Sequence, residues 1–193
     1  MSRPAALACT LLALLLSAGC AEPPSKEMNQ AQGAIDTARA AGAAEYATEE
    51  FNAAVEALQR SEAAVADGDY RLALNHALDS RERAQNAAKL AVEGRAQARG
   101  DAERVVAEVS ALLTRAEARL ADPEVGRVPR RALAAPRATI ESASTTLQEA
   151  RAALAADDYA GAITAIDGVA ADLQAALAAI DRAVSAQPAS RRR

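Results

Sequence analysis

The sequence has few aromatic residues, no tryptophan and a single histidine. Only 2% of its 193 residues are aromatic, although 51% are hydrophobic, because alanine accounts for most of the hydrophobic fraction. A sustained alternation of apolar and polar residues is absent and clusters of β-branched residues are few, so nothing favours a strand. We therefore predict an all-α protein whose core buries less apolar area than the hydrophobic fraction suggests.

The sequence also lacks the residue patterns of metal, phosphate and nucleophile sites. The one histidine, His76, has no second histidine or cysteine at a ligand spacing, which favours an ordinary helix position. The segment Asp67-Gly68-Asp69 is similar to the start of a calcium loop, but Arg71 stands where a third oxygen ligand is needed. No nucleophile elbow, phosphate-binding glycine loop or convergent carboxylate pair is evident. We expect a non-catalytic protein without a metal, a cofactor or a small-molecule substrate.

Positive charge is in slight deficit. The net charge is −4 for the whole chain, and −5 without residues 1–19, whose only charged residue is Arg3. This balance argues against a general nucleic-acid-binding protein. Basic residues nevertheless cluster near the middle and at the C-terminus, at Arg127, Arg130, Arg131, Arg137 and Arg191 to Arg193. One interpretation is contact with an anionic envelope surface; a solvated linker and tail is the interpretation that we favour.

One pattern occurs twice, in residues 58–74 and 147–163. Each copy continues an alanine-rich helical pattern into an acidic turn, and a second helix then starts at a tyrosine. We predict two related antiparallel helical hairpins in a coiled-coil-like bundle. In the first turn, Gly68 suits the left-handed conformation that ends helices, and Asp69 suits the cap of the next helix. The second turn has Asp157 and Asp158 without a glycine, so we expect a different geometry there.

The helices that follow the two turns differ in their apolar residues. After the second turn, residues from Tyr159 to Val184 alternate spacings of four and three, which predicts an unbroken heptad seam. After the first turn, the same seam starts at Tyr70 and thins to Arg81 and a run of alanines that includes Ala88. Because a buried leucine contributes more than an alanine, we expect the second hairpin to be the more stable.

The tyrosines at the two turns have two interpretations. Tyr70 and Tyr159 either pack at the closed ends of their hairpins, with the hydroxyl groups in water, or contribute to a partner-binding site. We favour packing, because an aromatic residue at a seam position usually belongs to the core.

The N-terminus has the organisation of a secretory signal. Arg3 precedes an apolar run that is too short to span a bilayer, and residues 16–20 read Leu-Ser-Ala-Gly-Cys. This ending resembles the lipobox of bacterial lipoproteins, which implies cleavage after Gly19 and lipidation of Cys20. Cys9 is then lost with the signal. The alternative is ordinary cleavage, which leaves a soluble secreted protein with a free thiol. Ala21 in place of an Asp implies the outer membrane in a Gram-negative cell.

We expect the mature chain to have the following parts. Residues 20–25 form a short tether that contains proline, and 26–122 form an N-terminal helical domain, in which one helix ends at Gly42 and Thr48 caps the next. A helix from Asp69 to Leu120 either is unbroken or splits at Gly94 or Gly100. Residues 123–137 form a linker rich in Pro and Arg, 138–187 the second hairpin and 188–193 a basic tail.

The first copy resembles a known family. Ala44 to Ala47, Phe51, Ala53 to Val55, the turn from Asp67 to Tyr70 and the run from Leu72 to Ala77 are similar to domain of unknown function 4398 (DUF4398). The resemblance covers about residues 28–99. It implies a bacterial helical hairpin, often behind a lipoprotein signal, but it implies no activity.

Two functions agree with these features. The first is a lipid-anchored helical adaptor that faces the periplasm and binds a periplasmic or envelope protein through a hairpin face or the groove between the hairpins. The seam gap at Arg81 and the alanine run that includes Ala88 favour this function, because a shallow alanine groove can accept another helix. The second is a structural spacer, or a coiled coil that associates with itself through the seam from Tyr159 to Val184. An adaptor predicts a monomer that binds another protein, whereas self-association predicts an oligomer that depends on concentration.

Overall fold

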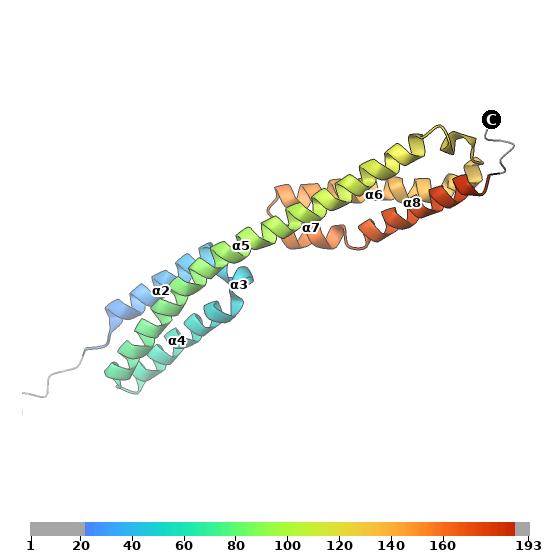
Figure 1. The fold of residues 1–193 in the computed structure, drawn as a ribbon. Helices are drawn as coiled ribbons and strands as arrows, with labels where there is room; N and C mark the ends of the chain where they lie inside the picture. The colour runs from blue at the N-terminus through green and yellow to red at the C-terminus, as the bar shows by residue number, and fades with distance from the viewer. Residues whose placement is uncertain (1–21, 188–193) are drawn as a thin grey trace, which may run out of the picture. The chain divides into compact units, whose positions relative to one another are not determined.

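The computed structural model describes residues 22–187 and divides into two compact units, Met1–Gly94 and Arg95–Arg193 (Figure 1). No strand occurs in the described residues, so the predicted all-α fold is confirmed. The signal segment, Gly19, Cys20 and the basic tail lie outside the described residues. The helices are α2 (Ser25–Ala40), α3 (Ala43–Tyr46), α4 (Thr48–Ala66), α5 (Tyr70–Ala121), α6 (Ala134–Ala155), α7 (Tyr159–Ala165) and α8 (Val169–Ser185), with short 3₁₀ helices η1 (Val125–Arg127) and η2 (Arg130–Leu133).

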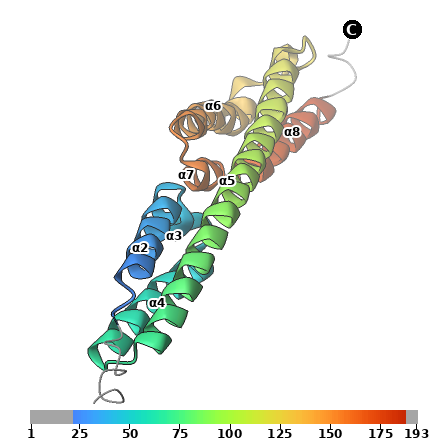
Figure 2. The ribbon, with the colours of Figure 1, turned by 90° about the vertical axis from the view of Figure 1, so that its left-hand side faces the viewer.

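The first unit packs α2 and α4 against the first part of α5, and Figure 2 shows both helices beside α5. The buried positions of each helix recur at spacings of three and four, so each helix presents one stripe to the core. Most of the buried side chains are alanines; the larger ones are Ile35, Phe51 and Leu58. Helices that meet through alanine approach closely but bury little apolar area per residue.

The second unit packs the last part of α5 against α6, α7 and α8. Its core contains larger side chains, among them Leu113, Leu147, Leu173 and Ile180. Residues 123–137, which we predicted to be a linker between domains, lie within this unit. Val125, Val128, Leu133 and Pro136 are buried, and α6 already begins at Ala134. The predicted 26–122 domain also differs from the structure, because α5 residues after Gly94 belong to the second unit's core.

The two related hairpins are present, and each belongs to a larger repeat of three helices. In the second unit, α7 and α8 together take the place of the third helix. The second and third helices of the two units have buried positions that recur 89 residues apart, as for Leu58 and Leu147 or Ala73 and Ala162. In the first helices, Ile35 and Ala38 correspond to Leu113 and Ala116. Helix α5 therefore provides the third helix of the first unit and the first helix of the second.

The two turns between paired helices share one geometry, which corrects the prediction that they differ. Gly68 and Asp157 both have a positive φ, at 77° and 61°. The N–H of the next residue then bonds back to the preceding helix in the same way, Asp69 to Ala64 and Asp158 to Ala153. Both caps also match, because Asp69 accepts from the Leu72 N–H and Asp158 accepts from the Gly161 N–H.

The predicted unbroken seam after the second turn is wrong. Helix α7 ends at Ala165, and α8 begins only at Val169, because Gly168 adopts a left-handed φ of 77°. Within α7 the buried positions are Tyr159 and Ala162, so Ile163 is exposed although the seam placed it inside. Leu173 and Ile180 remain fully buried.

Two further predictions concern helix ends and glycines. Thr48 does not cap α4; its hydroxyl donates to the Ala44 carbonyl, and α4 has no side-chain cap. Helix α5 is unbroken at both Gly94 and Gly100. Gly94 is instead a point of close approach, since a Cβ there would lie 3.0 Å from the Tyr46 carbonyl oxygen.

Candidate partner-binding groove

A shallow groove runs along the junction of α2 and α5 in the first unit and has a volume of about 610 Å³. Helix α2 contributes small or short side chains, Gly33, Ala34 and Thr37, together with Gln30. Helix α5 contributes Arg81, Gln85, Ala88 and Lys89. We refer to these eight residues as the α2–α5 groove.

The groove exists because small residues face one another across the helix junction. Ala34 and Ala88 are half-buried and pack on the core without filling the space above it. A Cβ added to Gly33 would meet no atom within 4 Å. Native helix junctions are normally filled to crystal-like density, so this open volume can accept side chains from another molecule.

The electrostatics of the groove are one-sided. Arg81 donates from Nη1 to Gln30 Oε1 at 2.7 Å, which bridges the two helices at one end. Lys89 makes no ion pair within the described residues. None of the eight residues that line the groove is acidic. The groove therefore favours an uncharged or anionic occupant over a cationic one.

Exposed aliphatic side chains extend the groove along α5. Leu78 is 38% exposed and Val92 is 62% exposed. One helical face carries both of them together with the groove residues, at spacings of three and four: Leu78, Arg81, Gln85, Ala88 and Val92. Leu78 and Val92 therefore lie at the two ends of a helical face whose middle lines the groove.

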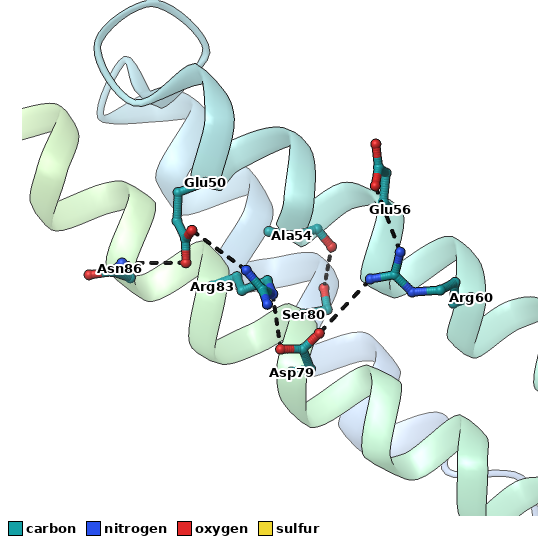
Figure 3. A network of polar contacts seen from close by, with 8 residues as sticks. All are labelled: Glu50, Ala54, Glu56, Arg60, Asp79, Ser80, Arg83 and Asn86. Carbon is teal, nitrogen blue, oxygen red and sulfur yellow. Dashed lines mark hydrogen bonds and ion pairs between the residues drawn. The ribbon is translucent and has the colours of Figure 1, made fainter.

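The other junction of α5 in this unit, with α4, is closed by polar contacts. Two buried serines bond reciprocally across it: Ser61 Oγ donates to the Ala73 carbonyl at 2.7 Å, and Ser80 Oγ donates to the Ala54 carbonyl at 2.8 Å. Figure 3 shows the second of these bonds and the surrounding polar and charged side chains, Glu50, Glu56, Arg60, Asp79, Arg83 and Asn86. These groups already have partners, so this junction presents little unused binding capacity.

The four predicted partner-binding residues have different environments. Arg81 and Ala88 both line the groove, where they were expected to lie together. Tyr70 is half-buried and does not line it. Tyr159 is 3% exposed and belongs to the second unit. We did not predict from the sequence that α2 lines the groove. The feature that could have indicated it is the pair of small residues Gly33 and Ala34 within a helical pattern.

Tyr159 takes part in a polar cluster at its turn. Its hydroxyl donates to Asp157 Oδ1 at 2.6 Å rather than pointing to water, and Arg95 donates to Asp157 Oδ2 at 2.8 Å. The Tyr159 hydrogen bond, together with the nearby Arg95 charge, lowers the pKa of Asp157. These contacts hold Asp157 in its left-handed conformation, which few residues other than glycine, asparagine and aspartate adopt. The cluster therefore has a structural explanation.

A hollow in the second unit is less suited to binding a partner. It has a volume of about 510 Å³ and is lined mainly by polar residues at one end of α5 and α8. Its principal charges are already paired, because Arg119 contacts Asp181 at 2.8 Å and Asp122 at 3.0 Å. Among residues 22–187, no group of three or more His, Cys, Asp or Glu side chains is placed to hold a metal ion.

One segment of the described chain, Tyr159–Ser185, is long and apolar enough to cross a membrane by length and composition alone. Core helices of soluble proteins meet the same criterion. In this structure the segment is interrupted between α7 and α8 and contributes Leu173 and Ile180 to the second unit's core. Its composition is therefore weak evidence of membrane contact.

Comparison with known proteins identifies one family. Residues 26–103 match the family model described as Domain of unknown function (DUF4398). The match covers the helices of the first unit, including both sides of the α2–α5 groove, so the N-terminal part of the chain is similar to this domain. No curated protein and no solved structure matches the chain.

Proposed function

We propose that the protein is a lipid-anchored adaptor of the bacterial cell envelope that binds a protein partner in the α2–α5 groove. The observation that carries this proposal is the groove itself, an open volume that Gly33 and Ala34 of α2 and Ala88 of α5 help to line and that Arg81 borders. The lipobox-like ending at Cys20 supports the anchor. The absence of an aspartate after Cys20 supports an outer-membrane location, facing the periplasm. No catalytic role is part of the proposal.

The alternative of a self-associating coiled coil has less support. Its motivation was the seam from Tyr159 to Val184, which is broken between α7 and α8. Leu173 and Ile180 of that seam are fully buried inside the second unit and are not available to another chain.

Crosslinking in cells tests the adaptor role. A photo-crosslinking residue in place of Ala88 is expected to form an adduct with a distinct envelope protein, identified by mass spectrometry. The matched control carries the crosslinker in place of Glu62, which is exposed on α4 away from the groove. Adducts with a second copy alone would favour the spacer, and equal yields at both positions would contradict a binding site in the groove.

The anchor has a separate test. Cys20→Ser removes the thiol that would carry the lipid, so the variant is expected to leave the membrane fraction and to lose labelling by a fatty-acid analogue. A parent protein without lipid label, with membrane association unchanged in the variant, would contradict the anchor while leaving the groove proposal intact.

A further inference from the structure

The second unit provides an internal template for the groove. Its first helix is the last part of α5, in which Leu112 corresponds to Ala34. These two residues directly precede the corresponding core residues Leu113 and Ile35. In α8, Leu177 corresponds to Ala88, which lies 89 residues before it in the sequence. Both leucines pack against the core of the second unit. The first unit thus lacks two large aliphatic side chains that the same fold elsewhere supplies for itself.

The residues at the edges of the groove are more apolar than the corresponding residues of the second unit. The exposed residues Leu78 and Val92 correspond to Asp167 and Asp181 in the second unit. Asp181 is in solvent contact and pairs with Arg119. The first unit therefore has aliphatic groups on the rim where the second unit has carboxylates, and open space where the second unit has leucines.

This comparison determines the chemistry of the occupant. We propose that the α2–α5 groove binds one amphipathic α-helix of another protein, which inserts two large aliphatic side chains about one turn apart and places carboxylates beside Arg81 and Lys89. The inference rests on the proposed adaptor function and specifies its partner. A helix fits because the groove lies between two helices, and side chains spaced three or four residues apart interdigitate with those of a helix pair.

Other occupants fit the groove less well. The chain's own basic tail, with Arg191 to Arg193, has the wrong charge for a groove with two cations and no carboxylate. The most apolar helix of a second copy, α8, uses Leu173 and Ile180 in its own core. An extended peptide would bind at a sheet edge or, as a polyproline segment, in an aromatic-lined groove; residues 22–187 contain no strand, and no aromatic residue lines the α2–α5 groove.

Two synthetic peptides test the proposal directly. Both are fluorescently labelled, alanine-based helices with the same pair of leucines four residues apart; one has glutamates beside the leucines and the other has lysines. The parent protein is expected to bind the acidic peptide at least about tenfold more tightly than the basic one in anisotropy titrations, which corresponds to about 1.4 kcal/mol.

Variants of the protein locate the binding site. Ala34→Leu combined with Ala88→Leu reproduces the second unit's filled junction and is expected to weaken binding of the acidic peptide at least about tenfold. Lys89→Glu is expected to reverse the preference between the two peptides, and it keeps the test valid if the double variant fails to fold. Ala178→Leu is the matched control, because Ala178 is exposed on α8 at the position that corresponds to Lys89.

The outcomes separate this inference from the proposed function. Equal binding of both peptides, undiminished binding by the double variant, or no binding at concentrations on the order of 1 mM would overturn the helix proposal. If the crosslinker at Ala88 still captures a distinct envelope protein in that case, the adaptor function stands and its partner has another chemistry.

Discussion

Gly94 and Gly100 lie six residues apart in α5, but only one of them is required by its surroundings. A Cβ at Gly94 would approach the Tyr46 carbonyl oxygen to 3.0 Å and the Tyr46 Cβ to 3.1 Å, whereas a Cβ at Gly100 would meet nothing within 4 Å. We expect Gly100→Ala to raise the free energy of unfolding by up to about 1 kcal/mol through helix propensity. Gly94→Ala is expected to be the less stable of the two by about 1 kcal/mol or more in urea unfolding. Equal stabilisation would show that Tyr46 moves aside without cost.

Asp157 makes stability depend on pH. The Tyr159 hydroxyl and the Arg95 charge lower its pKa in the folded state, so the ionised carboxylate stabilises the fold above about pH 4, the range of an unfolded aspartate. This stabilisation is lost as the pH falls through the lowered pKa. Asp157→Asn removes the titrating group but tolerates a positive φ. We expect its melting temperature to fall less than that of the parent between about pH 6 and about pH 2.

The control for this experiment is Asp167→Asn, which removes an exposed carboxylate from the neighbouring break between α7 and α8. It is expected to follow the pH profile of the parent. Identical profiles for the parent and Asp157→Asn would contradict a stabilising role for the Asp157 cluster.

The two turns illustrate how far local sequence determines a residue's conformation. Gly68 and Asp69 were correctly predicted, because a glycine and a capping carboxylate act through backbone groups within a few residues. The conformation of Asp157 was not, because Arg95, which helps to hold its carboxylate, lies 62 residues away in the sequence. A contact at that separation has no local pattern that reveals it.

At the scale of elements, the tyrosines that start α5 and α7 occupy corresponding positions with unequal burial. Tyr159 is 3% exposed and hydrogen-bonded, whereas Tyr70 is half-buried. Truncation of a buried aromatic residue typically costs about 3–5 kcal/mol. We expect Tyr159→Ala to approach this range and Tyr70→Ala to cost less than half as much, measured by urea unfolding followed by circular dichroism. A similar cost at both positions would contradict the difference in packing.

The serines between α4 and α5 make a second prediction for elements. Ser61 and Ser80 are fully buried, and each donates to a carbonyl of the opposite helix. A hydrogen bond of this kind contributes about 0.5–1.5 kcal/mol, so we expect each Ser→Ala variant to lose about 1 kcal/mol in urea unfolding. Ser142→Ala, at an exposed position of α6, is the matched control and should lie within about 0.5 kcal/mol of the parent.

Helices with large apolar side chains were easier to predict from the sequence than helices whose core stripe is mostly alanine. The bounds of the helices around the first turn were predicted well because Phe51, Val55 and Leu58 mark a helical stripe. The role of α2 as a full partner was underestimated, since its core stripe is Ala31, Ile35 and Ala38, and alanine gives little periodic signal. The same weakness hid the α2 side of the groove, whereas Arg81 and Ala88 were found as gaps in the α5 seam.

At the scale of the whole molecule, the two units differ in the apolar area they bury. Apart from Ile35, Phe51 and Leu58, the buried apolar residues of the first unit are alanines, whereas the second unit buries many leucine, isoleucine and valine side chains. We expect hydrogen exchange followed by mass spectrometry to show faster exchange in peptides from α2 and α4 than in peptides from α6 and α8. Equal protection, or the reverse order, would contradict the expected difference in stability.

The alanine core of the first unit also has a thermal consequence. The heat capacity change on unfolding rises with the apolar surface that becomes exposed, by about 0.45 cal/mol/K for each Å². A core of alanines exposes little such surface when it opens, so the heat capacity change per residue is small. The stability curve of the first unit is therefore broad and shallow, and it changes less steeply on warming or cooling than that of a leucine-rich core of equal length.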